Sequence, residues 1–269
     1  MTGPPRRTRS IAGQPVAWLE AGAGPPLVLV HGAGGSAELW PRQLDALADV
    51  AQVLAPDLPG HGPLGGRGRP SIAAYAEWLD AFLAAVTEEP AVLVGHSMGG
   101  AVAQALALLR PERLAGLVLL ATGARLRVVA RLVELLRHDP REGQSLIQDL
   151  SFGAAAAPEC AALVARVLRE GPPLVTLGDF LACDRFDVRE RLAAIRIPTL
   201  VVAGTADRLT PSRYARLLAA TIPGARLVEI EAAGHFPQLE QPGPVNAAIR
   251  AFLAERHDAA TGGRAESRA

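Results

Sequence analysis

Short apolar runs alternate along this chain with longer stretches of helical periodicity, and this alternation limits the possible folds more than any other feature. The runs, of which residues 27–30 are the first in the series, are rich in leucine and β-branched residues. They show no strict alternation of apolar and polar residues, which is typical of strands covered on both faces. The sequence therefore predicts an α/β fold with a mostly parallel sheet flanked by helices. The expected strands are 27–30, 52–55, 91–94, 114–120, 199–203 and 226–230, preceded by an antiparallel edge strand at 16–19, and the expected helices are 40–49, 71–87, 98–109, 211–220 and 245–255.

This alternation stops between residues 124 and 195, where helix-period segments follow one another without a convincing strand. We therefore expect a core domain made of residues 1–123 and 196–256, with residues 124–195 inserted as a helical cap. The final residues, 257–269, are small and polar, and we expect them to be disordered. The helical segments of the cap are 126–137, 142–150, 159–169 and 174–183.

The bulk composition excludes several classes of protein. The 27 basic and 27 acidic residues give zero net charge, so nothing indicates a nucleic-acid partner. The arginines near the N-terminus are followed by no apolar segment typical of a secretory signal. No apolar stretch is long enough to span a membrane. Because Cys160 and Cys183 are the only cysteines, we expect a reduced, cytoplasmic protein rather than a disulfide framework.

A serine lies at the corner between an expected strand and an expected helix. Residues 95–99 read Gly-His-Ser-Met-Gly, directly after the apolar run 91–94. Glycines on both sides of Ser97 allow a sharp turn in which the backbone is too crowded for a Cβ atom. The turn lifts the serine hydroxyl above the sheet edge, and the helix that begins at Met98 directs its amide groups and positive dipole end there. We therefore expect Ser97 to be a nucleophile, the alternative being a small residue at a tight turn.

A serine hydroxyl needs a base to take its proton. His235 follows the expected strand 226–230 through a short loop, and the Phe236-Pro237 pair that comes next is expected to prevent a helix from starting at once. His96 is the serine's own neighbour on the turn and should point elsewhere. The other histidines fall in glycine-rich loops, in the cap or in the tail, at positions 31, 61, 138 and 257. We therefore expect His235 to be the general base.

The histidine in turn needs a carboxylate that fixes its tautomer. Asp207 comes directly after the expected strand 199–203. The alternative for this residue is a turn or N-cap aspartate ahead of the helix expected from 211. Asp179 and two later aspartates, at 184 and 187, fall in the cap, and Asp57 precedes the nucleophile in the chain. Asp207 is therefore the expected orienting acid.

A negatively charged tetrahedral intermediate needs two backbone donors. We expect one to be the amide of Met98 and the other the amide of Ala33, in the glycine-rich segment 31–35 after the first parallel strand. Close approach of this backbone to the substrate would bring Gly32 and Gly34 into contact with it. His96 and Phe236, next to the expected nucleophile and base, complete the expected substrate contacts. A phosphate-binding turn is the alternative, but the segment contains neither a Gly-x-Gly-x-x-Gly motif nor a P-loop with a lysine.

These segments together resemble the α/β-hydrolase superfamily in its usual order. The resemblance rests on His31-Gly32, on residues 57–62 (Asp-Leu-Pro-Gly-His-Gly), on 95–100 (Gly-His-Ser-Met-Gly-Gly), on 204–207 and on Gly234-His235, and it covers about residues 14 to 255. It implies an eight-stranded sheet, a helical cap after the sixth strand, and catalytic groups at the carboxyl edge of the strands. It also implies that the segment 57–62 is structural. Serine at position 97, rather than aspartate, departs from the dehalogenase and epoxide-hydrolase branches.

The expected activity is hydrolysis of a carboxylic ester through an acyl-serine intermediate, with no metal and no organic cofactor. The expected partner is a small-molecule ester or related acyl substrate held by an apolar cap. Arginines 125, 127 and 131 are either an anchor for a substrate carboxylate or, as long charged side chains usually are, a solvated helix face. The same residues also suit a carbon–carbon bond hydrolase, a lactonase, an acyltransferase or a perhydrolase. A hydrolase-fold receptor without catalysis is a further alternative, and the oligomeric state is left open.

Overall fold

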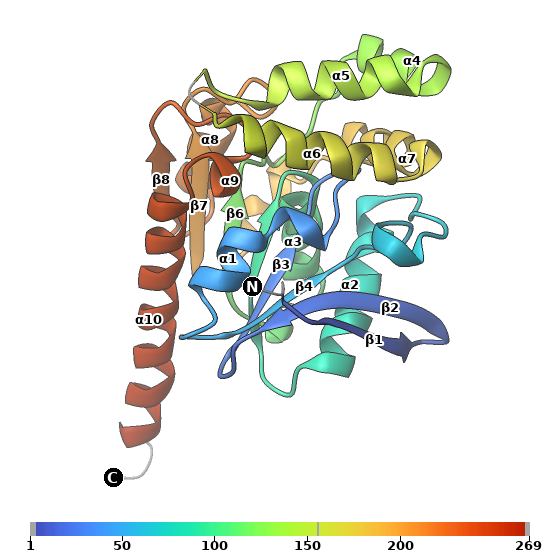
Figure 1. The fold of residues 1–269 in the computed structure, drawn as a ribbon. Coiled ribbons are helices and arrows are strands. Elements are labelled where there is room, and N and C mark those ends of the chain that lie inside the picture. Colours follow the sequence, from blue (N-terminus) through green and yellow to red (C-terminus); the bar gives the residue numbers. More distant parts are fainter. Residues whose placement is uncertain (1–3, 155, 267–269) are drawn as a thin grey trace.

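A computed structural model describes residues 4–154 and 156–266, and within them eight strands form one sheet (Figure 1). The strand order is β1-β2-β4-β3-β5-β6-β7-β8. The pairs β1/β2 and β2/β4 are antiparallel and all other pairs are parallel, which confirms the predicted fold class. The strands are β1 (Arg6–Ile11), β2 (Gln14–Ala21), β3 (Pro26–Val30), β4 (Gln52–Pro56), β5 (Ala91–His96), β6 (Leu114–Leu120), β7 (Thr199–Gly204) and β8 (Arg226–Ile230).

At one edge of the sheet, the structure has a strand, β1, that the sequence did not predict. Residues 16–19 do lie in an antiparallel strand, β2, but β1 pairs outside it, with Arg6 opposite Leu19. β1 was not predicted because it contains no apolar run. Its Arg7 and Arg9 are exposed. Charged side chains are common on edge strands, where they discourage pairing with a second chain.

Helices cover both faces of the sheet, and alternate strand residues belong to two separate apolar clusters. Val28 and Leu93 pack on one face with Phe82, whereas Leu29 and Val92 pack on the other with Phe252. Burial on both faces explains why the parallel strands are apolar without alternation. The first face is covered by α2 (Ile72–Val86), α3 (Met98–Leu109) and α8 (Ser212–Thr221), and the second by α1 (Pro41–Ala46) and α10 (Pro242–Glu266), which runs along one side of the molecule in Figure 1.

Between β6 and β7, the described residues form four consecutive helices that lie above the sheet in Figure 1. They have their own apolar cluster, in which Leu132, Ile147 and Val164 pack together with Phe236 and Leu239, two residues from outside the four helices. Phe236 and Leu239 come shortly after the end of β8, so the cap packs over the carboxyl edge of the sheet. The cap helices are α4 (Ala130–His138), α5 (Pro140–Ser151), α6 (Pro158–Glu170) and α7 (Pro173–Asp184).

Two expectations near the C-terminus are wrong. A short helix, α9 (Pro237–Glu240), begins directly after Phe236, because proline fits the first position of a helix, where its missing N–H is not needed. The helix α10 continues to Glu266, so residues 257–266 are helical and not disordered; residues 267–269 lie outside the described part.

None of the helices in the described residues is long and apolar enough to cross a membrane.

Candidate active site

Ser97 occupies a strained turn between β5 and α3. Its backbone has φ 53° and ψ −117°, in a region where a residue with a side chain is destabilised by roughly 1–3 kcal/mol. The neighbouring glycines make the turn possible. A Cβ atom on Gly95 would lie 2.3 Å from the Gly99 carbonyl oxygen, and one on Gly99 would lie 2.2 Å from that of Val30. The strand and the helix approach too closely here for any residue but glycine.

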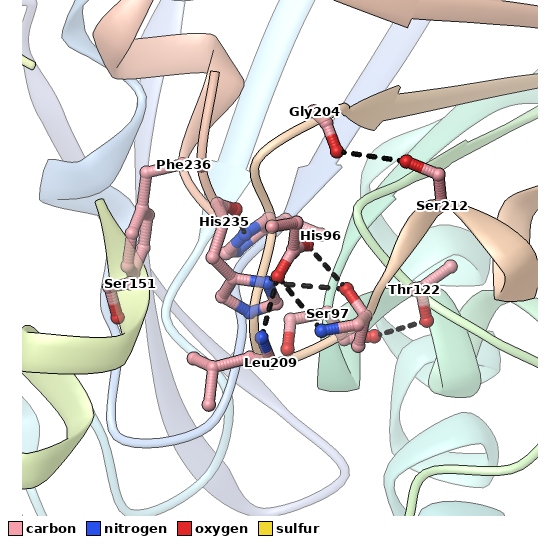
Figure 2. A network of polar contacts seen from close by, with 12 residues as sticks. His96, Ser97, Thr122, Ser151, Gly204, Leu209, Ser212, His235 and Phe236 are labelled. Carbon is pink, nitrogen blue, oxygen red and sulfur yellow. Dashed lines mark hydrogen bonds and ion pairs between the residues drawn. The ribbon is translucent and has the colours of Figure 1, made fainter. Parts of the chain in front are cut away.

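Hydrogen bonds to the backbone of Ser97 hold this turn in position. Its amide donates to the Leu120 carbonyl at 3.0 Å, and the Thr122 hydroxyl donates to its carbonyl oxygen at 2.7 Å (Figure 2). Both partners come from the end of β6 or the segment that follows. The orientation of the serine is therefore fixed by the neighbouring strand as well as by its own turn.

Asp207 and His235 form a buried pair at the ends of β7 and β8. The Asp207 Oδ2 atom lies 2.9 Å from His235 Nδ1, and it also accepts a hydrogen bond from the Thr210 hydroxyl at 2.7 Å. Its Oδ1 atom accepts from the amides of Leu209 and Thr210, both at 2.8 Å. Burial alone would raise the pKa of Asp207, but the charge of His235 and these hydrogen bonds outweigh it and lower the pKa. The carboxylate is thus kept ionised, and His235 carries its proton on Nδ1.

His235 lies beside the serine turn. The His96 Nε2 atom is 2.8 Å from the His235 carbonyl oxygen, so this nitrogen donates, and the two rings have centroids 4.9 Å apart. Burial, and then the nearby His235, lowers the pKa of His96 to about 3, so its ring is neutral. Ser97 and His235 line the same cavity, and Figure 2 shows both residues close together at the centre of the view. The structure therefore brings Ser97, Asp207 and His235 to one site.

The segment Gly32, Ala33, Gly34 and Gly35, here called the glycine loop, lines the cavity next to the serine turn: a Cβ atom on Gly32 would lie 3.1 Å from the Cβ of Ser97. The Gly35 amide donates to the Gly32 carbonyl at 3.0 Å, and the Gly34 amide donates to Asp179 at 2.9 Å. In the part of the chain that the structure describes, the Ala33 amide has no such partner. The Met98 amide is at the first position of α3, where no intrahelical partner exists. These two amides therefore remain available to a ligand, whereas that of Gly34 does not.

The cavity between the glycine loop and the cap has a volume of about 130 Å³. All four expected substrate contacts, Gly32, Gly34, His96 and Phe236, line it. The wall also contains two arginines, Arg127 and Arg208, and both are exposed. The rest of the wall is mostly apolar, with Leu39, Leu126, Val128, Val129, Leu132, Ile147, Leu150, Val164, Val167, Leu168, Phe180 and Leu209 among its residues.

Sequence reasoning missed a buried polar network centred on Asp179 in α7. The Asp179 carboxylate accepts hydrogen bonds from the Gly34 amide, from His61 Nε2 at 2.8 Å and from the Tyr75 hydroxyl at 2.7 Å. His61 Nδ1 faces two backbone carbonyl oxygens, of which that of Pro59 is 3.1 Å away. Both ring nitrogens must therefore donate, so His61 is an imidazolium ion. The sequence did contain a sign of this network, because Asp179 is a carboxylate within the mostly apolar face that α7 buries.

The electrostatics of this network agree with its hydrogen bonds. Burial alone would lower the pKa of His61, but the charge of Asp179 and the hydrogen bond to it outweigh burial and raise that pKa. The adjacent His31, with its ring centroid 4.8 Å away, has its pKa lowered to about 3 by burial and then by His61. Its Nε2 atom accepts from the Leu58 amide at 3.0 Å, so His31 is a neutral, structural residue.

A second missed carboxylate, Glu240 of α9, connects the cap with the loop that carries His235. It accepts hydrogen bonds from the amides of Gly153 and Gly234, both at 2.9 Å, and from that of Phe236 at 3.1 Å. The His235 amide also donates to the Ser151 carbonyl at the end of α5. The cap therefore supports the histidine directly.

Asp57, another carboxylate that the sequence offered, makes structural contacts. Asp57 accepts a hydrogen bond from the Ala37 amide at 2.8 Å and pairs with Arg6. A Cβ atom on Gly62, which has φ 62°, would lie 2.2 Å from the Asp57 carboxyl carbon. The described residues contain no group of three or more histidines, cysteines or carboxylates that could hold a metal ion.

An eight-stranded, mostly parallel sheet with a helical cap over its carboxyl edge defines the class of α/β hydrolases. The chain belongs to the alpha/beta hydrolase family, whose sequence model matches residues 27–248.

Several relatives of this chain are named as hydrolases or esterases. It is 34% identical to a putative carbamate hydrolase RutD of Azorhizobium caulinodans, over 87% of this chain and 93% of the relative. It is 32% identical to a pimeloyl-[acyl-carrier protein] methyl ester esterase of Aeromonas hydrophila, over 82% of this chain and 92% of that protein. Among solved structures, a thermophilic esterase shares 34% identity with a TM-score of 0.85, covering 94% of this chain and 98% of its own. The protein is accordingly an enzyme with esterase-like relatives.

Proposed function

We propose that this enzyme hydrolyses a carboxylic ester through an acyl intermediate on Ser97, with His235 as general base and Asp207 as the acid that orients it. The observation that carries the proposal is the 2.9 Å contact between Asp207 Oδ2 and His235 Nδ1, beside a serine on a strained turn that lines the same cavity. Because Nδ1 carries the proton, Nε2 is the nitrogen left to accept one from the serine hydroxyl.

In the first half of the reaction, the Ser97 hydroxyl oxygen attacks the ester carbonyl carbon while its proton passes to His235. The carbonyl oxygen becomes negative, and the free amides of Ala33 and Met98 bind it. The positive end of the α3 dipole adds to this stabilisation. The intermediate then collapses, the bond to the alcohol breaks, and His235 returns the proton to the departing oxygen.

The second half repeats these steps with water. His235 takes a proton from a water molecule, which attacks the acyl carbon, and the same two amides bind the second oxyanion. Collapse releases the carboxylic acid and returns the proton to Ser97. The buried Asp207 carboxylate stabilises the imidazolium ion in both halves without itself being protonated.

The wall of the cavity indicates an apolar group on the substrate. It is formed mainly by leucine, valine and phenylalanine side chains of the cap and the core domain. A small-molecule ester with a short or medium acyl chain fits this wall and volume. The methyl ester that gives the Aeromonas hydrophila relative its name belongs to the same chemical class.

A second candidate is hydrolysis of a carbamate by the same residues. It is favoured by the 34% identity to the putative carbamate hydrolase of Azorhizobium caulinodans. The chemistry would be the same addition to a carbonyl, with nitrogen attached to the carbonyl carbon. Lactone or carbon–carbon cleavage and acyl transfer need the same groups too, so substrate assays must separate them.

Two measurements test the proposal. Purified protein should be labelled at Ser97 by a fluorophosphonate, and Ser97→Ala should abolish both labelling and ester turnover. Rates on p-nitrophenyl esters of graded acyl length, compared with those on aryl carbamates, enol-lactones and ring-fission diketones, should then favour esters. Turnover of all these substrates by Ser97→Ala at the wild-type rate would contradict the proposal, and faster carbamate turnover would favour the second candidate.

A further inference from the structure

Asp179 is a fully buried carboxylate that joins the cap to the glycine loop. Its exposed fraction is 0%, and its two oxygens accept hydrogen bonds from three separate segments of the core domain. The Gly34 amide belongs to the glycine loop, His61 to the loop after β4, and Tyr75 to α2. The carboxylate itself is carried by α7 of the cap.

Stability alone is a poor explanation for this arrangement. The Asp179 carboxylate and the His61 imidazolium form a buried ion pair at 2.8 Å. Removing two charges from water has a desolvation penalty that often exceeds their attraction, and apolar residues of similar volume can fill such a site equally well. A buried pair of this kind has more value for fixing a particular geometry, and here it fixes the Gly34 amide.

The orientation of that amide controls the turn around Ala33. Gly34 has φ 63°, a left-handed conformation, and its N–H points at Asp179 Oδ2. With Gly34 in this conformation, the Gly35 amide reaches the Gly32 carbonyl at 3.0 Å. That carbonyl belongs to the same planar peptide unit as the Ala33 amide, so fixing one fixes the direction of the other.

The Gly32 carbonyl also accepts a hydrogen bond from His31 Nδ1 at 2.8 Å. His31 is in turn packed against His61, the partner of Asp179. Two routes therefore connect the aspartate with the peptide unit that carries the Ala33 amide: one through Gly34, the other through the two histidine rings.

We propose that Asp179 is a positioning residue that aims the Ala33 amide at the substrate oxyanion by holding the Gly34 amide from the cap helix α7. This inference rests on the proposed function, because it gives the Ala33 amide its role in binding the oxyanion. It also gives the cap a part in catalysis, since displacement of α7 would release the glycine loop.

The test is Asp179→Leu, which keeps the approximate size of the side chain but removes the oxygen that accepts from the Gly34 amide. Deleting an oxyanion donor lowers kcat by about 10² to 10³. A misdirected donor should lower kcat by up to about 10²-fold on this scale, with KM little changed. An alkyl boronic acid forms a tetrahedral adduct with the serine, and its Ki should rise by the same factor. The Ki of the matching carboxamide, which forms no adduct, should stay at the wild-type value.

The control is Ile249→Ala, a fully buried residue of α10 on the far face of the sheet. It should lower the urea midpoint of unfolding while leaving both Ki values unchanged. If Asp179→Leu behaves like this control, Asp179 is only structural and the inference is overturned. If Asp179→Leu does not fold, the smaller Asp179→Val takes its place: it also removes the acceptor of the Gly34 amide, so the boronic acid Ki should rise, and an unchanged Ki overturns the inference.

Wild-type protein separates this inference from the proposed function. If it binds the boronic acid no more tightly than the carboxamide, the acyl-serine mechanism fails, and the inference fails with it. If it binds the boronic acid far more tightly and the Asp179 variant does so equally, the inference fails alone.

Discussion

Replacing Asp207 with asparagine should leave the fold intact and remove most of the activity. The reason lies in the hydrogen bonds that the two carboxylate oxygens of Asp207 make. Asp207 Oδ1 accepts from two backbone amides, those of Leu209 and Thr210, at 2.8 Å each. The oxygen of an asparagine must occupy that position, because an NH2 group there would face two donors. The NH2 group then takes the place of Oδ2, 2.9 Å from His235 Nδ1.

This exchange puts the histidine in the wrong tautomer. Facing an NH2 group, Nδ1 must accept a hydrogen bond, so the proton of a neutral His235 moves to Nε2 and the ring can no longer take a proton from Ser97. In other serine hydrolases the same substitution lowers kcat by about 10⁴-fold, equivalent to about 5 kcal/mol in the activation barrier. We expect Asp207→Asn to lower kcat/KM for a p-nitrophenyl ester by a factor of this size.

Thr210→Val is the matched control. The Thr210 hydroxyl also bonds Asp207 Oδ2, but its removal leaves the Asp207 to His235 contact and the tautomer intact. Losing one hydrogen bond to a charged group costs about 1.5–3 kcal/mol, so kcat/KM should fall by about 150-fold at most, far less than 10⁴-fold. If folded Asp207→Asn protein is no more impaired than the threonine variant, Asp207 does not fix the tautomer of the base and the reasoning is refuted.

Three further outcomes are expected. Ser97→Ala should lower kcat on the order of 10⁶-fold with an unchanged urea midpoint, and a loss under tenfold would rule out a serine nucleophile. Gly99→Ala should lower the free energy of unfolding by more than about 3 kcal/mol, since its Cβ would lie 2.2 Å from the Val30 carbonyl oxygen; near-wild-type stability in urea would contradict this packing. Because the pKa of His61 is raised above its ordinary 6.5, its contribution to stability is complete below that pH and lost as pH rises through the higher folded value. Wild type should therefore lose stability relative to His61→Gln on the alkaline side, and parallel curves of unfolding free energy against pH would refute the ion pair with Asp179.

The elements with the longest apolar runs were predictable from the sequence. β6 and α3 have the expected bounds, because burial on both faces or at a regular helical spacing leaves a strong local pattern. β8 also has the expected bounds, although Ile230 is its one buried residue. The order of Ser97, Asp207 and His235 along the chain could also be recognised from the sequence. Each follows a parallel strand, and the carboxyl ends of such strands meet at one edge of the sheet.

What the sequence did not reveal depends on distant contacts. β1 is defined by its pairing with β2 and not by its own polar residues. The partners of Asp179 lie 104 to 145 residues away along the chain, so no local pattern links them. The three amides that Glu240 binds likewise come from the cap and from the histidine loop. Such groups are recognisable only once the fold brings them together.

Trapping the acyl intermediate tests the central claim most directly. The protein is mixed with a p-nitrophenyl ester, quenched in acid within one turnover, digested, and mapped by mass spectrometry. The account predicts the mass of the acyl group on the peptide that contains Ser97, and on no peptide from Ser97→Ala. An acyl group on a different residue, or steady-state turnover by wild type with no acylated peptide in any quench, would contradict it.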